Sequence, residues 1–357
     1  MPRTLPAAQP ASPGAEPLPI CAVIVSYNRA EELRRCLASL RLQRPALARV
    51  VVVDNGSTDA SLAMLRAEFP WVELIAAGAN LGPCIARNMG AARAREPLLW
   101  FLDSDTTVPE ADGAARLHAL FAADQDLAAA GGEALVDAAG RSIGVKRLRC
   151  GASGIIQGDR ITGPAPVTAE CPVIASCNLM VRARDFARAG GFDPYYFFFY
   201  EDMDLTWRLH ALGRRQVVLS PMPVLHHYSE NVRIKRVWQH ARNRMYFCLK
   251  HLPWHRIALM PLADLGFVFQ LDNLRRLLSR ARQPEAAASA VAATEAAPAG
   301  STLRRAVALL GRMAAIVTLG YVALPVVLGP ALRARRALGQ PAAVPVGWDA
   351  AAAPTGR

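Results

Sequence analysis

Short apolar runs alternate with amphipathic segments over the first 105 residues, and this alternation constrains the fold more than any other feature. The segments repeat apolar residues at helical spacing, as at Leu33, Leu37 and Leu40. Strands covered by helices on both faces of a parallel sheet have continuous apolar sequences of this kind. The runs are ICAVIVSYN, RVVVVDNGSTD, WVELIAAG and PLLWFLDSD, and the segments between them are residues 29–42, 60–69 and 82–94. We predict an α/β fold with a Rossmann-like, mostly parallel central sheet flanked by helices.

Polar clusters follow three of these predicted strands. They are Ser26-Tyr27-Asn28, the DNGSTD stretch that begins at Asp54, and Asp103-Ser104-Asp105. In open α/β sheets the ligand crevice lies beyond the carboxyl ends of the strands. The sequence therefore predicts a binding site where these clusters meet.

The acidic pair Asp103 and Asp105 ends a buried strand, where uncompensated carboxylates are costly. Carboxylates two residues apart can share a hard divalent cation, which keeps other coordination positions for phosphate oxygens. This favours Mg²⁺ or Mn²⁺ holding a diphosphate. On the residues alone the alternative stays open that one Asp caps the next turn and the other faces water.

Asp54 ends the second predicted strand, and a carboxylate there can accept the imide N–H of a pyrimidine base. Ser57, Thr58 or Asp59 can also cap the following helix. These two interpretations use different residues, so both can hold.

The stretch YEDMD crowds Glu201, Asp202 and Asp204 beside a run of aromatic residues. Burial and like charge should raise the pKa of at least one of these carboxyls. A carboxylate of this kind suits a general base that takes a proton from an attacking hydroxyl. Alternatively, the acids only complement the positive end of a helix dipole.

The adjacent histidines His226 and His227 follow a further predicted strand. A neutral imidazole could complete the metal shell begun at Asp105, or donate a hydrogen bond to the departing phosphate. A purely structural histidine remains possible, and the pattern does not choose between the two residues.

The last third of the chain holds the whole basic surplus. Residues 231–357 contain 18 of the 41 Lys and Arg but 5 of the 29 Asp and Glu. Such a segment is attracted to an anionic membrane surface or to nucleic acid. Because the arginines alternate with Leu, Ala and Val and not with aromatics, we expect a membrane and no nucleic acid.

Residues 313–330 carry no charge and reach the lower length limit for a membrane span. Gly320, Pro325 and Gly329 interrupt the pattern. We expect a segment that lies at the membrane interface or inserts shallowly, and a true span stays the alternative.

From about Ile20 to Glu230 the chain resembles the family 2 glycosyltransferases, in particular bacterial enzymes of the rhamnosyltransferase type. The motifs that carry the resemblance are VIVSYNR, VVVVDNGSTD, NLGPCIARNMG, FLDSD, CNLMVR, GGFDPYYFFFYEDMDLTWRLHALG and the closing His. The resemblance implies the glycosyltransferase A fold. It also implies an inverting, metal-dependent transfer from a UDP- or dTDP-linked sugar to a glycan or polyprenyl-linked acceptor.

The resemblance also implies roles for single residues. The donor-binding positions are Ser26, Tyr27, Asp54, Asn80, Arg87 and Asp103. Asp105 is the implied metal ligand, with His226 favoured over His227 as its partner. Asp202 is the implied catalytic base with Glu201 beside it, and Asn178 and Gly191 belong to the acceptor side.

Composition and resemblance together divide the chain into expected segments. These are a disordered leader (1–18), a catalytic domain (19–230, with a nucleotide-sugar half 19–130 and an acceptor half 131–230), an amphipathic helical extension (231–283), a linker (284–302), an apolar membrane-associating segment (303–340) and a disordered tail (341–357). Within the acceptor half, residues 131–170 are expected to form short strands and a mobile loop.

Seven cysteines without a C-x-x-C pair indicate a reducing compartment. We expect a cytoplasmic protein, peripheral on the inner face of the cytoplasmic membrane. A sugar nucleotidyltransferase and a non-catalytic nucleotide-sugar-binding module remain the alternatives. The former usually has a Gly-rich, Lys-containing phosphate loop, which VSYNRAEELRR lacks, and the latter does not need an acid at position 202.

Overall fold

A computed structural model describes residues 16–136, 142–150, 154–162, 167–227, 237–269, 311 and 314–338. The expected linker and tail, and residues 1–15 of the expected leader, lie outside the described residues.

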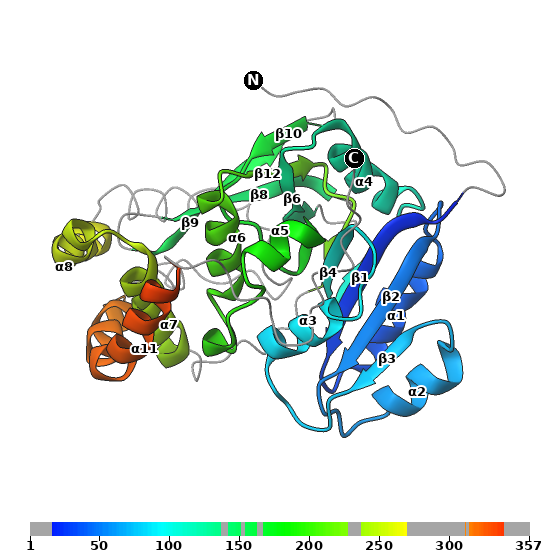
Figure 1. Ribbon diagram of the computed structural model, residues 1–357, viewed down its shortest axis with the longest axis horizontal. Coiled ribbons are helices and arrows are strands. Elements are labelled where there is room, and N and C mark those ends of the chain that lie inside the picture. Colours follow the sequence, from blue (N-terminus) through cyan, green and yellow to red (C-terminus); the bar gives the residue numbers. More distant parts are fainter. Residues whose placement is uncertain are drawn as a thin grey trace, which may run out of the picture.

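An eight-stranded sheet in the order β10-β12-β6-β11-β4-β1-β2-β3 forms the centre of the molecule (Figure 1). Its strands are β1 (Leu18–Ser26), β2 (Leu47–Asp54), β3 (Glu73–Ala76), β4 (Leu98–Asp103), β6 (Leu127–Gly131), β10 (Val167–Glu170), β11 (Asn178–Arg182) and β12 (Arg215–Ser220). Neighbours among β4, β1, β2 and β3 pair in parallel, as do β6 and β12, whereas β11 and β10 run antiparallel to their partners. The predicted mostly parallel sheet flanked by helices is confirmed.

Helices cover this sheet, and the first three arise where the periodicity predicts them, whereas α4 was not predicted. They are α1 (Ala30–Arg41), α2 (Ser61–Glu68), α3 (Pro83–Ala91), α4 (Gly113–Ala123), α5 (Ala183–Arg188) and α6 (Glu201–Ala211), with a 3-10 turn, η1 (Pro194–Tyr196). The predicted apolar stripe of α1, Leu33, Leu37 and Leu40, is buried. Helix α3 approaches the sheet closely at Gly90, where an added Cβ would lie 2.4 Å from Val23 Cγ1. Only a glycine allows that approach.

Two smaller sheets accompany the central sheet. Strand β5 (Thr106–Thr107) pairs with β13 (Leu225–His226). The strands β7 (Glu133–Val136), β8 (Ser142–Cys150) and β9 (Ile156–Thr162) form an antiparallel sheet of their own. Short strands were expected in this region, but β8 is nine residues long, and it pairs with β9 from Gly144 to Cys150.

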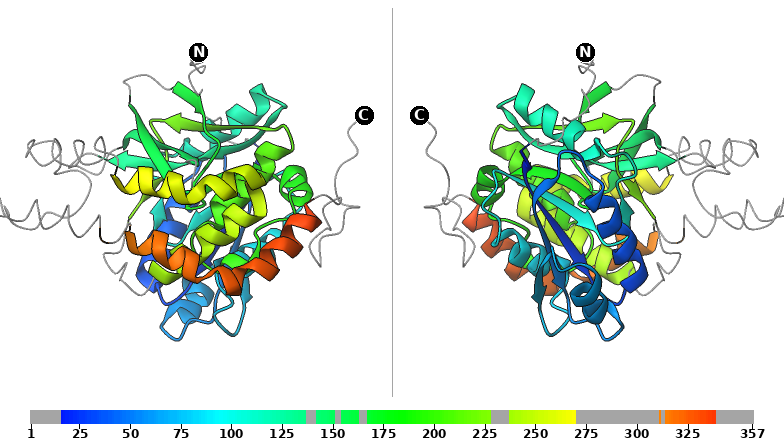
Figure 2. Two further views of the ribbon diagram at one scale, coloured as in Figure 1. Left: turned by 90° about the vertical axis from the view of Figure 1, so that its left-hand side faces the viewer. Right: turned by 90° about the vertical axis from the view of Figure 1, so that its right-hand side faces the viewer.

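The C-terminal helices form a layer at one side of the molecule. They are α7 (Val237–His251), α8 (Trp254–Phe269), a helix at Ala314–Val322 and α11 (Leu324–Ala337). Figure 2 (left) shows α8 and the last two helices on the same side, with α7 between them. The helices at Ala314–Val322 and Leu324–Ala337 bend by 75° at their junction. Within the described residues no single helix has the length and hydropathy of a membrane span. Taken together, the two helices of this bent pair reach that length and hydropathy, and among the described residues they are the one pair that does so.

Specific side-chain contacts tie these helices together. Arg244 of α7 is fully buried and pairs with Asp264 of α8. The hydroxyl of Tyr321 donates to the other oxygen of Asp264 at 2.9 Å. Arg335 of α11 donates to the Leu249 and Leu252 carbonyl oxygens at 2.9 and 2.7 Å. The apolar C-terminal segment therefore packs on α7 through both polar and apolar contacts.

Candidate active site

The acidic pair at the end of β4 lies beside His226. Because β13 pairs antiparallel with β5, His226 stands opposite Thr106, next to both acids. Its Nε2 lies 3.1 Å from Asp105 Oδ1 and 3.9 Å from Asp103 Oδ2. One ligand atom from each of these three residues lies within 4.8 Å of the others, so the group could hold a metal ion.

The acids and the histidine of this group favour one another's charged forms. Burial opposes the charged form of Asp105, but the hydrogen bond from His226 and nearby positive charge outweigh it and lower the pKa of Asp105. Burial likewise opposes the charge on His226, yet Asp105 and Asp103 raise the pKa of His226. The acidic pair thus presents negative charge that a cation can balance.

His227, the other candidate, points elsewhere. Its Nε2 lies 2.8 Å from Thr107 Oγ1, and its backbone N–H donates to the Asp105 carbonyl oxygen at 2.8 Å. Burial and the charge of Arg35 lower the pKa of His227. The geometry therefore brings the ring of His226, and not that of His227, to the acidic pair.

Arg29, which the sequence analysis did not single out, forms an ion pair with Asp105. Arg29 directly precedes α1 and is the last residue of the VIVSYNR motif. Its position just after a strand was the one signal in the sequence that could have pointed to it. Its guanidinium partly balances the acidic pair in this structure.

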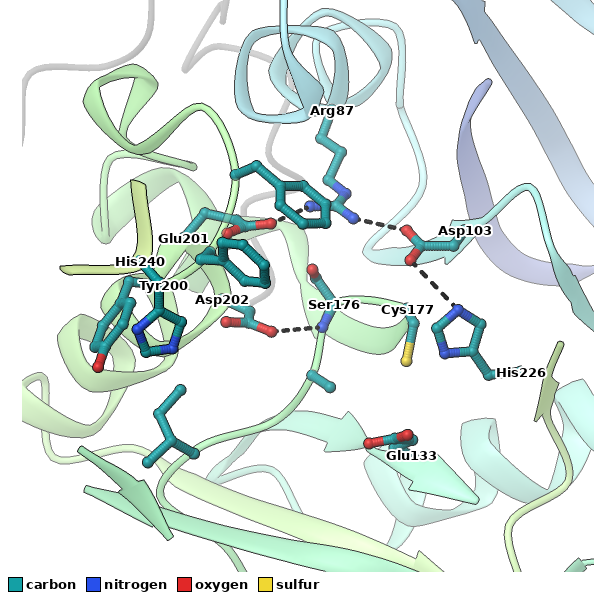
Figure 3. Close-up of a pocket in the computed structure, with 14 residues that line it drawn as sticks. Arg87, Asp103, Glu133, Ser176, Cys177, Tyr200, Glu201, Asp202, His226 and His240 are labelled. Carbon is teal, nitrogen blue, oxygen red and sulfur yellow. Dashed lines mark hydrogen bonds and ion pairs between the residues drawn. The ribbon is translucent and has the colours of Figure 1, made fainter. Parts of the chain in front are cut away.

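Arg87 joins the acidic pair to the start of α6. It lies in α3 and is buried, with Nη2 2.7 Å from Asp103 Oδ1 and Nη1 3.4 Å from Glu201 Oε1 (Figure 3). A donor-pocket position was expected for Arg87. The structure places it between the two halves of the site, where it neutralises one carboxylate from each.

A pocket of about 190 Å³ lies between these groups. Figure 3 shows Asp103 and His226 at one side and Glu201, Asp202 and His240 at the other. The further lining residues Phe198, Phe199, Ile156 and Glu133 come from the aromatic run and from the small antiparallel sheet. Sequence reasoning missed His240, since α7 lies far along the chain.

Glu201 and Asp202 open α6 inside this pocket. Burial, then the charge of Asp202, raises the pKa of Glu201 to about 7. Burial also raises the pKa of Asp202, against the backbone N–H groups of Met203 and Ser176, which donate to its oxygens at 2.7 and 3.4 Å. The arrangement provides a half-buried carboxylate, that of Asp202, which backbone donors hold and which can accept a proton.

Ser26 and Asp54 are register partners on β1 and β2. Asp54 Oδ1 accepts from the Ser57 backbone N–H at 3.0 Å. Ser26 Oγ and Asp54 Oδ2 are buried and have no hydrogen-bond partner among the described residues. Since buried polar atoms are nearly always paired, these two indicate a place for a ligand's polar edge. Tyr27, beside them, is 44% exposed.

The alternative capping role in DNGSTD also occurs. Asp59 Oδ1 accepts from the backbone N–H of Ser61, the first residue of α2, at 3.0 Å. Capping and the free oxygen of Asp54 therefore coexist, as their use of different residues allowed.

Three expected site residues do not line the pocket and instead make hydrogen bonds within the surrounding structure. Asn80 Oδ1 accepts from Asn55 Nδ2 and from the Gly82 N–H, both at 3.1 Å, which shapes the turn before α3. Asn178 is buried in β11, between Trp100 Nε1 at 2.8 Å and the Gly132 carbonyl oxygen at 3.2 Å. Gly191, at φ 68°, offers its carbonyl oxygen to Arg208 at 2.7 Å.

The central sheet, with an acidic pair at the end of β4, has the fold of known structures. The chain superposes with a TM-score of 0.53 on "Mannosyltransferase PcManGT from Pyrobaculum calidifontis in complex with GDP-Man and Mn2+", at 18% identity over 87% of this chain and 90% of that one. On "GalNAc-T7 with UDP, GalNAc and Mn2+" the TM-score is 0.51, at 19% identity over 65% of this chain and 50% of that one. The fold is that of glycosyltransferases of the A type.

Sequence comparisons give the family. Residues 21–133 match the model described as Glycosyl transferase family 2. The chain is 29% identical over 280 residues, 66% of this chain and 86% of the relative, to the N-acetylglucosaminyl-diphospho-decaprenol L-rhamnosyltransferase of Mycobacterium tuberculosis. It is 38% identical over 83 residues, 23% of this chain and 26% of the relative, to the rhamnosyltransferase WbbL of Escherichia coli. Residues 21–133 therefore form a family 2 glycosyltransferase domain, and the relatives support a glycosyltransferase over the alternatives of a nucleotidyltransferase and a non-catalytic module.

Proposed function

We propose that this enzyme transfers a sugar, with inversion, from a UDP- or dTDP-linked donor to a hydroxyl of a lipid-linked or membrane-associated glycan. The observation that carries the proposal is one pocket with Asp103 and His226, which form a group with Asp105, at one side and the half-buried carboxylate of Asp202 at the other. An inverting transfer needs these two functions on opposite faces of the sugar ring.

Donor binding is assigned to the carboxyl edge of β1, β2 and β4. The free oxygen of Asp54 accepts the imide N–H of the base, and the Ser26 hydroxyl serves the same polar edge. Two structures of the same fold hold a nucleotide or nucleotide sugar together with Mn²⁺, which supports a nucleotide-linked donor here.

The residues present fit a divalent cation. Two carboxylates and one imidazole converge, and hard ions such as Mg²⁺ and Mn²⁺ accept carboxylate oxygens, with imidazole a common further ligand. Asp105 and His226 would hold the ion, and Asp103, already bound to Arg87, would contact the ribose or the ion. A cation bound there supplies charge neutralisation for the leaving diphosphate.

Asp202 acts as the general base in this proposal. The acceptor hydroxyl gives its proton to Asp202 while its oxygen forms the new bond to the anomeric carbon. The bond from that carbon to the diphosphate oxygen breaks on the opposite face, and the bonding electrons leave with the diphosphate. Arg87 keeps Glu201 beside the base and offsets part of the negative charge around it.

We assign the contact with the membrane, where the acceptor lies, to the C-terminal helices. Helix α8 exposes Leu259, Leu262 and Leu265, and the bent pair exposes Val322 and Val326. Figure 2 (left) shows these helices on one side of the molecule. Exposed arginines at 256, 333 and 336 flank them. Such a surface suits the headgroup region of an anionic membrane. The Mycobacterium relative is named for a lipid-linked acceptor, which supports peripheral attachment at the inner face of the cytoplasmic membrane.

The test is a donor screen on the purified full-length chain. Protection against thermal unfolding and slow donor hydrolysis are measured with UDP- and dTDP-sugars, with and without Mn²⁺ or Mg²⁺. We expect one donor class to stabilise the protein only with the metal, and Asp105→Asn to abolish that stabilisation. Equal stabilisation of the Asp105→Asn variant would refute the proposed donor site.

A further inference from the structure

The segment before α6 has a strained backbone. Phe197, Phe199 and Tyr200 adopt positive φ angles of 55°, 69° and 70°. Side chains other than glycine rarely adopt this conformation, which costs on the order of 1–3 kcal/mol per residue. Tyr200 directly precedes Glu201 and Asp202, so the strain lies where the chain presents its carboxylate pair. Such a conformation persists only if neighbouring groups enforce it.

Asn243 of α7 makes the contacts that can enforce it. It is fully buried, and its Nδ2 lies 2.8 Å from each of the backbone carbonyl oxygens of Tyr196, Phe198 and Phe199. These three carbonyls share the two N–H groups of one side chain. A single amide therefore holds most of the turn that leads to α6.

The orientation of this amide follows from its neighbour. Arg242 donates from Nε and Nη2 to Asn243 Oδ1 at 3.0 and 2.7 Å. A guanidinium can only donate, so the oxygen must face Arg242 and the NH₂ must face the carbonyls. Arg242 also donates to the Tyr195 carbonyl oxygen at 3.1 Å, which extends the contact to the start of the turn.

Helix α7 also holds the far side of α6. Lys250 Nζ and His251 Nε2 each lie 2.7 Å from Asp204 Oδ1, and Asp204 is fully buried. Helix α7 thus fixes α6 at Asp204 and fixes the turn before α6 at Asn243. None of these α7 residues lies in the segment that matches the family model, which ends at residue 133.

We propose that Asn243 is a positioning residue for the reaction: its amide holds the strained turn Phe197–Tyr200 and so aims the Asp202 carboxylate into the pocket. This rests on the proposed role of Asp202 as base. The C-terminal extension is then part of the catalytic apparatus, besides any role at a membrane.

The proposal separates catalysis from donor binding. Without the amide, the turn relaxes toward ordinary backbone angles and the carboxylate pair moves. A displacement of about 1 Å at a reacting group can cost about 100-fold in rate. Donor binding should not change, because Asp54 and His226 lie on strands, and Asp105 in the turn between β4 and β5, that Asn243 does not contact.

The experiment compares Asn243→Ala with Tyr246→Phe in the full-length enzyme. Tyr246 lies on the same helix and donates one hydrogen bond to Asp193 at 2.9 Å, without touching the carbonyls of the strained turn. Steady-state transfer, nucleotide diphosphate binding with Mn²⁺, and amide hydrogen exchange of residues 197–202 are measured for both. Asn243→Ser, whose hydroxyl keeps one donor, replaces Asn243→Ala if that variant is insoluble.

We expect Asn243→Ala to lose about 100-fold in kcat, with faster exchange in residues 197–202 and unchanged nucleotide affinity. Tyr246→Phe should keep kcat within about threefold of the native enzyme. A kcat for Asn243→Ala equal to that of Tyr246→Phe, or unchanged exchange, would overturn the proposal. Asp202→Asn is assayed in parallel. If this variant turns over normally, the assigned base is wrong, but the hydrogen-exchange data still test whether Asn243 holds the turn Phe197–Tyr200.

Discussion

At the scale of single residues, Arg87 explains how two acidic groups from distant parts of the chain share one pocket. Its guanidinium contacts Asp103 from β4 and Glu201 from α6, and it is almost fully buried. A buried charge is tolerated only when it is paired, and here one cation pairs with two carboxylates. The acids near the pocket therefore form one electrostatic unit.

Asp202→Asn tests the base directly. The amide keeps the shape of the side chain but cannot accept the hydroxyl proton, so kcat should fall by about 10²- to 10⁴-fold. Nucleotide binding should remain, because the donor contacts lie on β1, β2 and β4. Turnover is measured with saturating donor, and binding is measured by titration calorimetry. A variant with nearly full turnover would remove Asp202 from the mechanism.

Glu201 should make stability depend on pH. Its pKa is raised to about 7 in the folded enzyme, against the ordinary value of 4.5. As pH rises through this window the unfolded chain loses a proton that the folded chain keeps, so the free energy of unfolding falls. The stabilisation is complete below pH 4.5 and is lost by about pH 7, with a total of about 3 kcal/mol.

Glu201→Gln removes this titration. Urea unfolding at pH 5 and pH 8 should show a smaller difference in the variant than in the native enzyme. If both proteins lose the same stability between the two pH values, Glu201 does not ionise as its burial implies.

The adjacent histidines provide a matched pair for the metal site. His226→Ala removes a ring that contacts Asp105, whereas His227→Ala removes one that contacts Thr107. We expect His226→Ala to raise the Mn²⁺ concentration needed for half-maximal activity by about tenfold or more, by analogy with the loss of other groups at metal sites. His227→Ala should leave that concentration unchanged. The reverse order of effects would assign the site to His227.

At the scale of elements, the sequence predicts most of the nucleotide half. The alternation of apolar runs with segments of helical period, such as Leu33, Leu37 and Leu40, is enough to place β1 to β4 and α1 to α3. This works because each element buries a face whose period depends on its own residues. The antiparallel insertion of β11 between β4 and β6 is a pairing of distant segments, which no local period encodes.

The candidate site is likewise predictable from local sequence only in part. Strand-end chemistry alone predicts a site at Asp54, Asp103 and Asp105, because parallel strands end at one edge of the sheet. The choice of His226 over His227 needs the pairing of β5 with β13, and the contact of Arg29 with Asp105 needs α1 in place. The roles of these residues in catalysis stay predictions.

At the scale of the whole molecule, the C-terminal layer packs against the segment that carries α6. Lys250 and His251 compensate the buried charge of Asp204, and Phe247 and Cys248 are fully buried. A chain cut near residue 229 would lose α7 and leave the buried Asp204 with Arg208 but without Lys250 and His251, which is destabilising. Membrane attachment therefore has to be tested with surface substitutions and not by truncation.

The exposed leucines of α8 permit such a test. Leu259, Leu262 and Leu265 are 56%, 66% and 55% exposed, and each should lose contact with water at a membrane. Replacing all three by Gln should weaken flotation with anionic liposomes by at least about tenfold, since burying one leucine contributes about 1.5–3 kcal/mol.

Leu42→Gln is the matched control, because Leu42 is 59% exposed but follows α1 in the nucleotide half. It should float like the native enzyme. Equal flotation of the triple variant and the native enzyme would show that α8 does not contact the membrane.

The central claim is that the acidic pair after β4, with His226, holds a divalent cation and the donor diphosphate, while Asp202 faces the sugar from the other side. The most direct test is a crystal structure with uridine or thymidine diphosphate and Mn²⁺, with the ion located by anomalous scattering. The account predicts the manganese peak between Asp105 and His226, and the base against Asp54. A nucleotide bound elsewhere, or an anomalous peak away from these side chains, would contradict it.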